Sequence, residues 1–169
     1  MTVIALVTPH SRHDALEAEL RNMSGIEVVR FGDKSELTKA ALEKIGPRYV
    51  FVAHWSWKIP AEIFDNFECI IFHMTDVPFG RGGSPLQNLI VRGIRDTKLT
   101  ALRCVAEMDA GAVYMKRPLS LEGTAEEILR RASVLTGEMI KAILHSPPVP
   151  TPQEARSPHS AAVLPRKAT

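Results

Sequence analysis

Short apolar runs alternate with segments of helical periodicity along most of this chain, and this alternation constrains the fold more than any other feature. The runs lie at residues 3–7, 26–31, 49–53, 69–72, 99–105 and 112–116. Continuous apolar runs are typical of strands buried on both faces of a sheet. Strands that alternate with helices form a mostly parallel sheet covered on both sides. The sequence therefore predicts an α/β fold with a doubly wound, mostly parallel, Rossmann-like sheet.

Side chains that can cap a helix stand before the segments expected to be helical, at Ser11, Ser35, Ser84 and Thr124. Ser11 and Asp14 resemble a capping box, and Thr124 with Glu127 forms a second one before a long, amphipathic last helix. A shorter helix is expected at residues 60–64. The sixth run follows the fifth so closely that these two strands are expected to be antiparallel.

One catalytic domain over residues 1–145 and a Pro-rich C-terminal tail over 146–169 are expected from the length and the change in composition. The tail has no periodic apolar pattern. It is either a disordered end or an extended arm anchored by Val149, Val163 and Leu164. Truncation after His145 is expected to leave a folded, active protein. A homodimer through the last helix stays open, although a core-facing helix is favoured.

Composition narrows the function classes. The net charge of +2 gives no electrostatic case for nucleic acid. No apolar run reaches the roughly 20 residues of a membrane span, and the N-terminus lacks the pattern of a signal peptide, so the cytoplasm is the expected location. Cys69 and Cys104 lie inside apparent strands and are interpreted as buried, reduced thiols. No Cys/His spacing indicates a metal site.

His73 and Asp109 are the candidate catalytic residues. His73 ends an apolar run, and Asp109 lies in a polar turn after the next predicted strand. Open α/β sheets bind substrates in the crevice outside the carboxyl ends of their strands. A histidine and a carboxylate that meet there can transfer protons.

Two neighbouring segments are candidate binding elements. The glycine-rich turn at residues 79–83 either binds an anion or a carbonyl, or serves only as a tight turn. Trp55 and Trp57 form either a flat apolar wall for a ring system or ordinary packing. His10 and His13 have no partner pattern and are expected at the surface.

Residues 49–128 resemble the formyltransferase superfamily, which includes methionyl-tRNA and glycinamide ribonucleotide formyltransferases. In that family a strand ends in Asn-x-His, a Pro-x-x-Arg-Gly turn follows, and an Asp-x-Gly turn comes later. Here His73 stands at the histidine, residues 77–82 form the Val-Pro-Phe-Gly-Arg-Gly turn, and residues 109–111 form Asp-Ala-Gly. Pro85 and Gln87 match the helix that follows the turn.

The resemblance implies a folate-dependent N-formyltransferase that uses 10-formyltetrahydrofolate as formyl donor and needs no metal. In this interpretation His73 stabilises the oxyanion of the tetrahedral intermediate, while Asp109 orients His73 and accepts the amine proton. The folate site implied by the family pattern comprises His54, Trp55, Ser56, Trp57, Lys58, Ile59, Arg81 and Gly82.

Three departures from the family pattern bear on the substrate. The family asparagine falls on Ile71, so Gln87, Asn88 or His54 would have to supply the missing hydrogen bond. No C-terminal domain for tRNA follows, and the first loop has no glycine for a phosphate. These departures favour the small branch that formylates amino sugars for surface glycans, with a small-molecule amine as substrate and no nucleic-acid partner. The alternatives are a non-catalytic folate- or sugar-binding relative and a formyltransferase acting on another amine, such as methionyl-tRNA.

Overall fold

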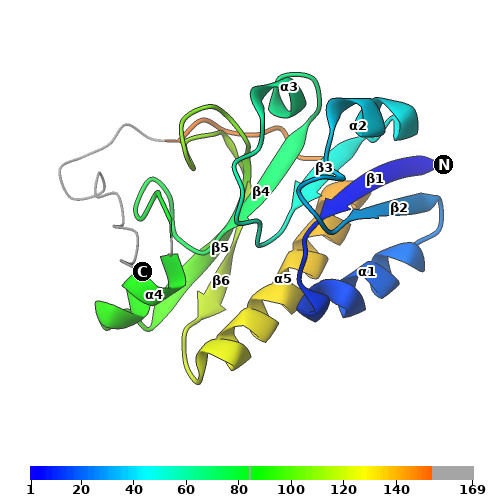
Figure 1. Ribbon diagram of the computed structural model, residues 1–169. Helices are drawn as coiled ribbons and strands as arrows, with labels where there is room; N and C mark the ends of the chain where they lie inside the picture. Colours follow the sequence, from blue (N-terminus) through cyan, green and yellow to red (C-terminus); the bar gives the residue numbers. More distant parts are fainter. Residues whose placement is uncertain (84, 154–169) are drawn as a thin grey trace.

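A six-stranded sheet in the order β2-β1-β3-β4-β5-β6 forms the centre of the molecule (Figure 1). The computed structural model describes residues 1–83 and 85–153. The predicted α/β fold is confirmed, and all six predicted strands are present. Their bounds are β1 Thr2–Val7, β2 Ile26–Phe31, β3 Tyr49–Val52, β4 Cys69–His73, β5 Asp96–Arg103 and β6 Val113–Ser120.

The direction of β5 differs from the simplest form of the prediction. Strands β1 to β4 are parallel, whereas β5 runs antiparallel to β4. The helix between them, α4 (Pro85–Val91), has 7 residues and does not carry the chain back along the sheet (Figure 1). The chain therefore enters β5 at the edge where β4 ended. β6 is antiparallel to β5, as predicted.

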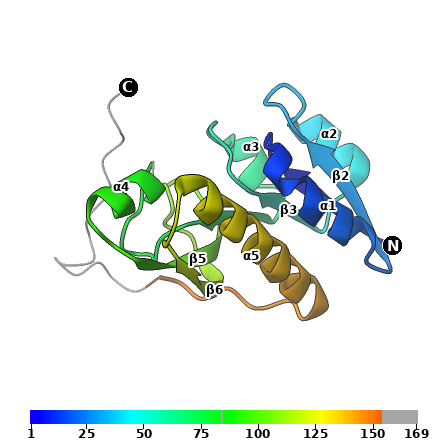
Figure 2. The ribbon, with the colours of Figure 1, turned by 90° about the horizontal axis from the view of Figure 1, so that it is seen from below.

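Helices cover both faces of the sheet, as predicted (Figure 2). Helices α1 (Asp14–Arg21) and α5 (Ala125–His145) lie on one face, and their buried side chains Leu16, Leu20 and Met139 pack against β1 and β3. Helices α2 (Lys39–Ile45) and α3 (Ala61–Phe64) cover the other. The apolar stripe of α5 thus faces the core. Cys69 and Cys104 are buried and unbridged, as predicted.

The four predicted helix starts had different outcomes. The Thr124–Glu127 capping box of α5 is confirmed. The capping box at Ser11 is wrong, because residues Ser11–His13 form a 3-10 helix (η1) and neither η1 nor α1 has a side-chain cap. Ser35 does not cap α2 either, because that helix begins at Lys39 and Thr38 is its cap. Ser84 lies outside the described residues.

The segment after α5 runs beside β6 in Figure 2 and pairs with the first residue of that strand. Thr151 and Val113 exchange backbone hydrogen bonds of 2.7 and 2.8 Å. Residues 146–153 therefore form an arm that packs on the sheet. Val149, predicted as an anchor, is 88% exposed, and the other predicted anchors, Val163 and Leu164, lie outside the described residues. Within residues 1–83 and 85–153, no helix is both long and apolar enough to cross a membrane.

Candidate active site

The structure brings the two predicted catalytic side chains together. His73 is the last residue of β4, and Asp109 lies in the turn between β5 and β6. Nε2 of His73 is 3.5 Å from Oδ2 of Asp109, and each side chain is only 9% exposed. β5 is antiparallel to β4 and its last residue, Arg103, pairs with Ile70 near the start of β4, so the turn that carries Asp109 folds back to reach His73 at the carboxyl edge of β4. That edge is where open α/β sheets bind their ligands.

The imidazole of His73 has a fixed backbone partner. Its Nε2 atom lies 2.8 Å from the carbonyl oxygen of Gly80, which also accepts a 3.3 Å hydrogen bond from Oγ1 of Thr75. A carbonyl can only accept, so Nε2 carries the hydrogen and Nδ1 of the neutral ring keeps its lone pair. Sequence reasoning missed Thr75 and the Gly80 carbonyl, because a backbone acceptor leaves no signal in the pattern of side chains.

The carboxylate of Asp109 is held from the other side by the glycine-rich turn. The backbone N–H of Gly82 donates to its Oδ2 atom at 2.9 Å. Asp109 itself has a φ of 53°, in the left-handed region that non-glycine residues seldom adopt. At Gly111 a Cβ atom would lie 1.7 Å from the carbonyl oxygen of Arg103, so the turn requires glycine there. The turn therefore fixes where the carboxylate points.

Arg81 and Gly82, predicted to bind the cofactor, face inward. Arg81 is 8% exposed, and its guanidinium donates to Gln153 and lies 3.7 Å from Glu107. The Gly82 N–H is already paired with Asp109. Through these contacts the glycine-rich turn holds the turn that carries Asp109. The contact of Arg81 and Gly82 with a cofactor remains a prediction.

The loop after β3 presents one tryptophan to solvent and packs the other. Trp55 contacts the apolar cluster under α2 and α3, together with the buried Ile59. Trp57 is 38% exposed and lies edge-on to Trp55, with ring centroids 4.8 Å apart. The three polar residues of the predicted folate loop, His54, Ser56 and Lys58, are exposed. This arrangement offers an accessible aromatic face at residue 57.

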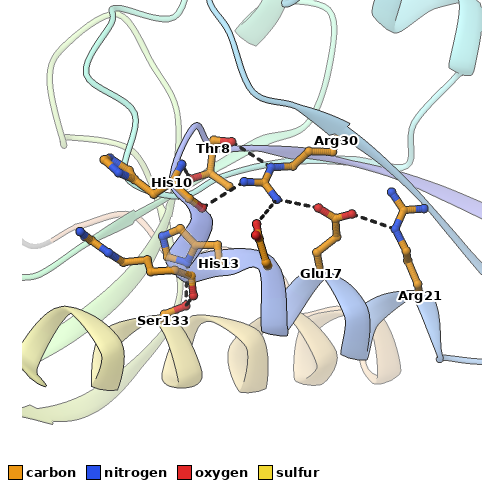
Figure 3. A network of polar contacts seen from close by, with 9 residues as sticks. Thr8, His10, His13, Glu17, Arg21, Arg30 and Ser133 are labelled. Carbon is orange, nitrogen blue, oxygen red and sulfur yellow. Dashed lines mark hydrogen bonds and ion pairs between the residues drawn. The ribbon is translucent and has the colours of Figure 1, made fainter. Parts of the chain in front are cut away.

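The prediction of a surface position for His13 is wrong. His13 is 3% exposed, and its Nδ1 atom lies 2.7 Å from Oγ of Ser133 on α5 (Figure 3). Burial, followed by the nearby His54 and Arg12, lowers the pKa of His13 to about 3. His10 is half-buried, and its ring meets that of His54 with centroids 5.0 Å apart.

Arg30 of β2 organises the loop after β1 from within. Its guanidinium donates to the carbonyl oxygens of Thr8 and His10 at 2.9 and 3.0 Å. It also donates to Glu17 at 2.6 Å and Asp14 at 3.2 Å (Figure 3). These bonds fix a loop that has no glycine. The pairing joins residues distant in sequence, so no local pattern could have found it.

A cleft of about 900 Å³ lies between α1 and α5, away from His73 and Asp109. Its charged lining is mixed, because Arg12, Arg130 and Lys141 are joined by Glu19, Glu126 and Glu138. Because these opposite charges balance, the cleft does not have a strong electrostatic potential of either sign. Within the described residues no cluster of three or more His, Cys, Asp or Glu side chains is placed to hold a metal ion.

Ile71, at the position of the family asparagine, is half-buried and packs on the cluster beneath α2 and α3. The proposed replacements are differently placed. Gln87 and His54 are exposed, while Asn88 is half-buried and already has an interaction partner. The identity of the second donor stays a prediction.

No family model matches the chain. The structure is similar to that of a methionyl-tRNA formyltransferase from Clostridium thermocellum, with a TM-score of 0.93 and 43% identity. The match covers 99% of this chain and 74% of that one. The chain belongs to the formyltransferase superfamily. The resemblance inferred from His73, the glycine-rich turn and Asp109 is thereby confirmed.

Two further comparisons define the limits of this similarity. A methionyl-tRNA formyltransferase from Rickettsia felis is 28% identical over 111 residues, which are 63% of this chain and 37% of that protein. This chain therefore spans little more than a third of that curated relative. The formyltransferase PseJ from Anoxybacillus kamchatkensis, in complex with UDP-4,6-dideoxy-4-formamido-L-AltNAc and tetrahydrofolate, has a TM-score of 0.68, 20% identity and coverage of 90% of this chain and 82% of its own. It shares the fold.

Proposed function

We propose that this protein transfers the formyl group of 10-formyltetrahydrofolate to a primary amine. The observation that carries the proposal is the buried pair of His73 and Asp109 at the carboxyl edge of β4, with a distance of 3.5 Å between Nε2 and Oδ2. The similarity of nearly the whole chain to a formyltransferase supports it.

In the proposed reaction the amine nitrogen attacks the formyl carbon, and the carbonyl electrons move to the formyl oxygen. His73 donates a hydrogen bond to that developing oxyanion. Because Nε2–H stays on the Gly80 carbonyl, the donor to the oxyanion is Nδ1, which requires a proton on each ring nitrogen at this step. Asp109 takes the proton released by the amine, directly or through a water. The oxyanion electrons then re-form the carbonyl as the bond between the formyl carbon and N10 of the folate breaks, and N10 takes the proton that Asp109 received from the amine.

The formyl donor is proposed to bind beside the loop after β3. A pterin combines a flat ring with a polar edge, so it needs an apolar wall and backbone hydrogen bonds together. The exposed face of Trp57 supplies such a wall. The exposed residues Ser56 and Lys58 supply polar groups beside it. The PseJ relative was solved with tetrahydrofolate, which supports a folate donor.

For the acceptor, the comparisons favour the alternative over the amino sugar expected from the sequence. The relatives at 43% and 28% identity are methionyl-tRNA formyltransferases, whereas the sugar-bound formyltransferase PseJ is only 20% identical. We therefore propose the α-amino group of methionyl-tRNA as the acceptor. This proposal replaces the expectation from the sequence that nucleic acid is not a partner. The proposal rests on these relatives, since the net charge is only +2.

A competition between acceptors tests the proposal. The protein is incubated with 10-formyltetrahydrofolate and either methionyl-tRNA or a nucleotide-linked amino sugar, and formylated product is measured by mass spectrometry. Formylation of methionyl-tRNA is the expected result. Formylation of the sugar alone would return the acceptor to the amino-sugar class. Tetrahydrofolate binding with no turnover on either amine would identify a non-catalytic relative, in line with the loss of the asparagine at Ile71.

A further inference from the structure

A side chain from the C-terminal arm reaches the turn that carries Asp109. Nε2 of Gln153 donates to the backbone oxygen of Asp109 at 2.8 Å and to that of Gly111 at 2.9 Å. These two bonds use both hydrogens of the amide nitrogen. One side chain therefore holds the two ends of the Asp109-Ala-Gly turn.

The other end of the same amide holds the glycine-rich turn. Oε1 of Gln153 accepts from Nε of Arg81 at 3.0 Å and from Nη2 of Arg81 at 2.6 Å. The guanidinium can only donate and the two carbonyls can only accept, so the orientation of the amide is fixed by its partners. Gln153 thus bridges the turn after β4 to the turn after β5.

The Asp109 turn needs such a support. Its φ of 53° is rarely adopted by a residue with a side chain, and such a conformation persists only when its surroundings fix it. The Gly82 N–H fixes the carboxylate, whereas Gln153 fixes the main chain. The backbone pairing of Thr151 with Val113, two residues earlier, brings Gln153 to this position.

We propose that Gln153 is a positioning residue, which acts through Asp109 and makes the C-terminal arm part of the active site. This inference rests on the proposed function. Gln153 holds the Asp109 carboxylate at its distance from His73 and in line to accept the amine proton. A displacement of a reacting group by about 1 Å can cost on the order of 100-fold in rate.

Two variants separate the two ends of the amide. Gln153→Ala removes all four hydrogen bonds, whereas Gln153→Glu keeps acceptors for Arg81 and removes the donors to Asp109 and Gly111. We expect kcat to fall roughly 10- to 100-fold in both, with KM for the folate donor changed by less than about threefold. Thr151→Ala is the matched control, because its side chain is exposed and its pairing is through the backbone. Wild-type kcat in both Gln153 variants would overturn the proposal.

A double-variant cycle distinguishes positioning from a general structural role. If Gln153 acts through Asp109, Gln153→Ala costs little further rate in an Asp109→Asn background, because the group it positions is already disabled. Equal losses in both backgrounds would mean that Gln153 acts elsewhere. Thermal melting of each variant identifies any that fails to fold. If Gln153→Ala fails to fold, Gln153→Glu is compared in the two backgrounds instead.

A measurement without turnover keeps this inference separate from the proposed function. Hydrogen exchange of the Gly82 amide, followed by NMR, reports the bond from its N–H to Asp109. We expect exchange to accelerate by at least about tenfold in Gln153→Ala and to be unchanged in Thr151→Ala. An unchanged Gly82 amide in Gln153→Ala overturns the positioning role even if the protein formylates nothing. Accelerated exchange in an inactive wild-type protein would leave positioning standing and remove the proposed function.

Discussion

Oδ2 of Asp109 accepts a hydrogen bond from the backbone N–H of Gly82 at 2.9 Å. The same oxygen lies 3.5 Å from Nε2 of His73. One carboxylate oxygen therefore joins the glycine-rich turn to the end of β4. Because both acidic and imidazole side chains are buried, water screens their interaction poorly. This geometry suits a carboxylate that orients the imidazole and receives a proton.

Removing either member of the pair should abolish most turnover. We expect His73→Ala and Asp109→Asn each to lower kcat by about 10²- to 10³-fold, the usual loss for one group that stabilises a developing oxyanion. Asp76→Asn is the matched control, because Asp76 is an exposed carboxylate on the loop that follows His73 and pairs with Lys116. Steady-state kinetics on methionyl-tRNA measures the effect. Near wild-type kcat in either variant would show that the roles are wrongly assigned.

Restoring the family asparagine at Ile71 should not help. The side chain of Ile71 packs in the apolar cluster beneath α2 and α3, where an amide has few partners. A buried amide left without hydrogen bonds costs roughly 1–3 kcal/mol, and because position 71 is half-buried, Ile71→Asn should lower the free energy of unfolding by about 1 kcal/mol, the lower end of that range. Denaturant unfolding and kcat are measured together, with Ile71→Val as the apolar control. A large rise in kcat would instead identify an impaired enzyme that lacks only this donor.

The fold was largely predictable because its signals are local. The apolar runs identified all six strands, and the capping box at Thr124 located the start of α5. The antiparallel direction of β5 was not predictable, since it depends on the path of the short α4. The capping interpretation of Ser11 failed because Ser11 is itself the first residue of a 3-10 helix, whose cap position is His10, and so does not stand in the extended position before a helix.

The sequence predicted the catalytic side chains of the candidate site but not the contacts that hold them in place. His73 ends β4 and Asp109 follows β5, which made both candidates, but β5 is antiparallel to β4 and it is the folding back of the β5–β6 turn that brings Asp109 to His73. The Gly80 carbonyl, Gln153 and the buried position of His13 depend on contacts between segments distant in sequence. No periodicity or motif encodes such contacts.

The contacts of the arm change the expectation for truncation. All three apolar clusters lie within residues 4–143, so a chain ended after His145 should still fold. It would lack the Thr151 pairing and the Gln153 bridge, and we expect it to lose about 10- to 100-fold in kcat. A chain ended after Gln153 keeps both contacts and serves as the control. Thermal melting and formylation are compared in the two. Full activity after truncation at His145 would restore the expectation from the sequence.

Trp57 should contribute to binding of the folate donor and little to the amine. Its side chain is 38% exposed and stands on the loop after β3. We expect Trp57→Ala to weaken binding of a tetrahydrofolate analogue by about 10-fold, the loss typical of one stacking contact of 1–1.5 kcal/mol. Calorimetric titration of both ligands measures the effect, with Val91→Ala on α4 as a control for an exposed apolar side chain. Unchanged folate affinity with lost amine affinity would move the tryptophan to the acceptor side.

His13 should make the stability of the fold depend on pH in the mildly acidic range. Burial, with His54 and Arg12 nearby, lowers its pKa from 6.5 to about 3. The unfolded chain therefore binds a proton below pH 6.5 that the folded protein does not bind until about pH 3. The stabilisation is fully present above the unfolded pKa and is lost as the pH falls, by about 1.4 kcal/mol per pH unit.

Denaturant unfolding at pH 7 and pH 5 tests this expectation. His13 alone should lower the free energy of unfolding by roughly 2 kcal/mol between these two values. His13→Asn keeps a polar atom near Oγ of Ser133 and removes the titration, so its curve should fall by that much less over the same interval. His145→Asn, at the exposed end of α5, is the control for losing a histidine elsewhere. If His13→Asn and wild type lose the same stability between pH 7 and pH 5, the protonation of His13 does not contribute to the pH dependence of the free energy of unfolding.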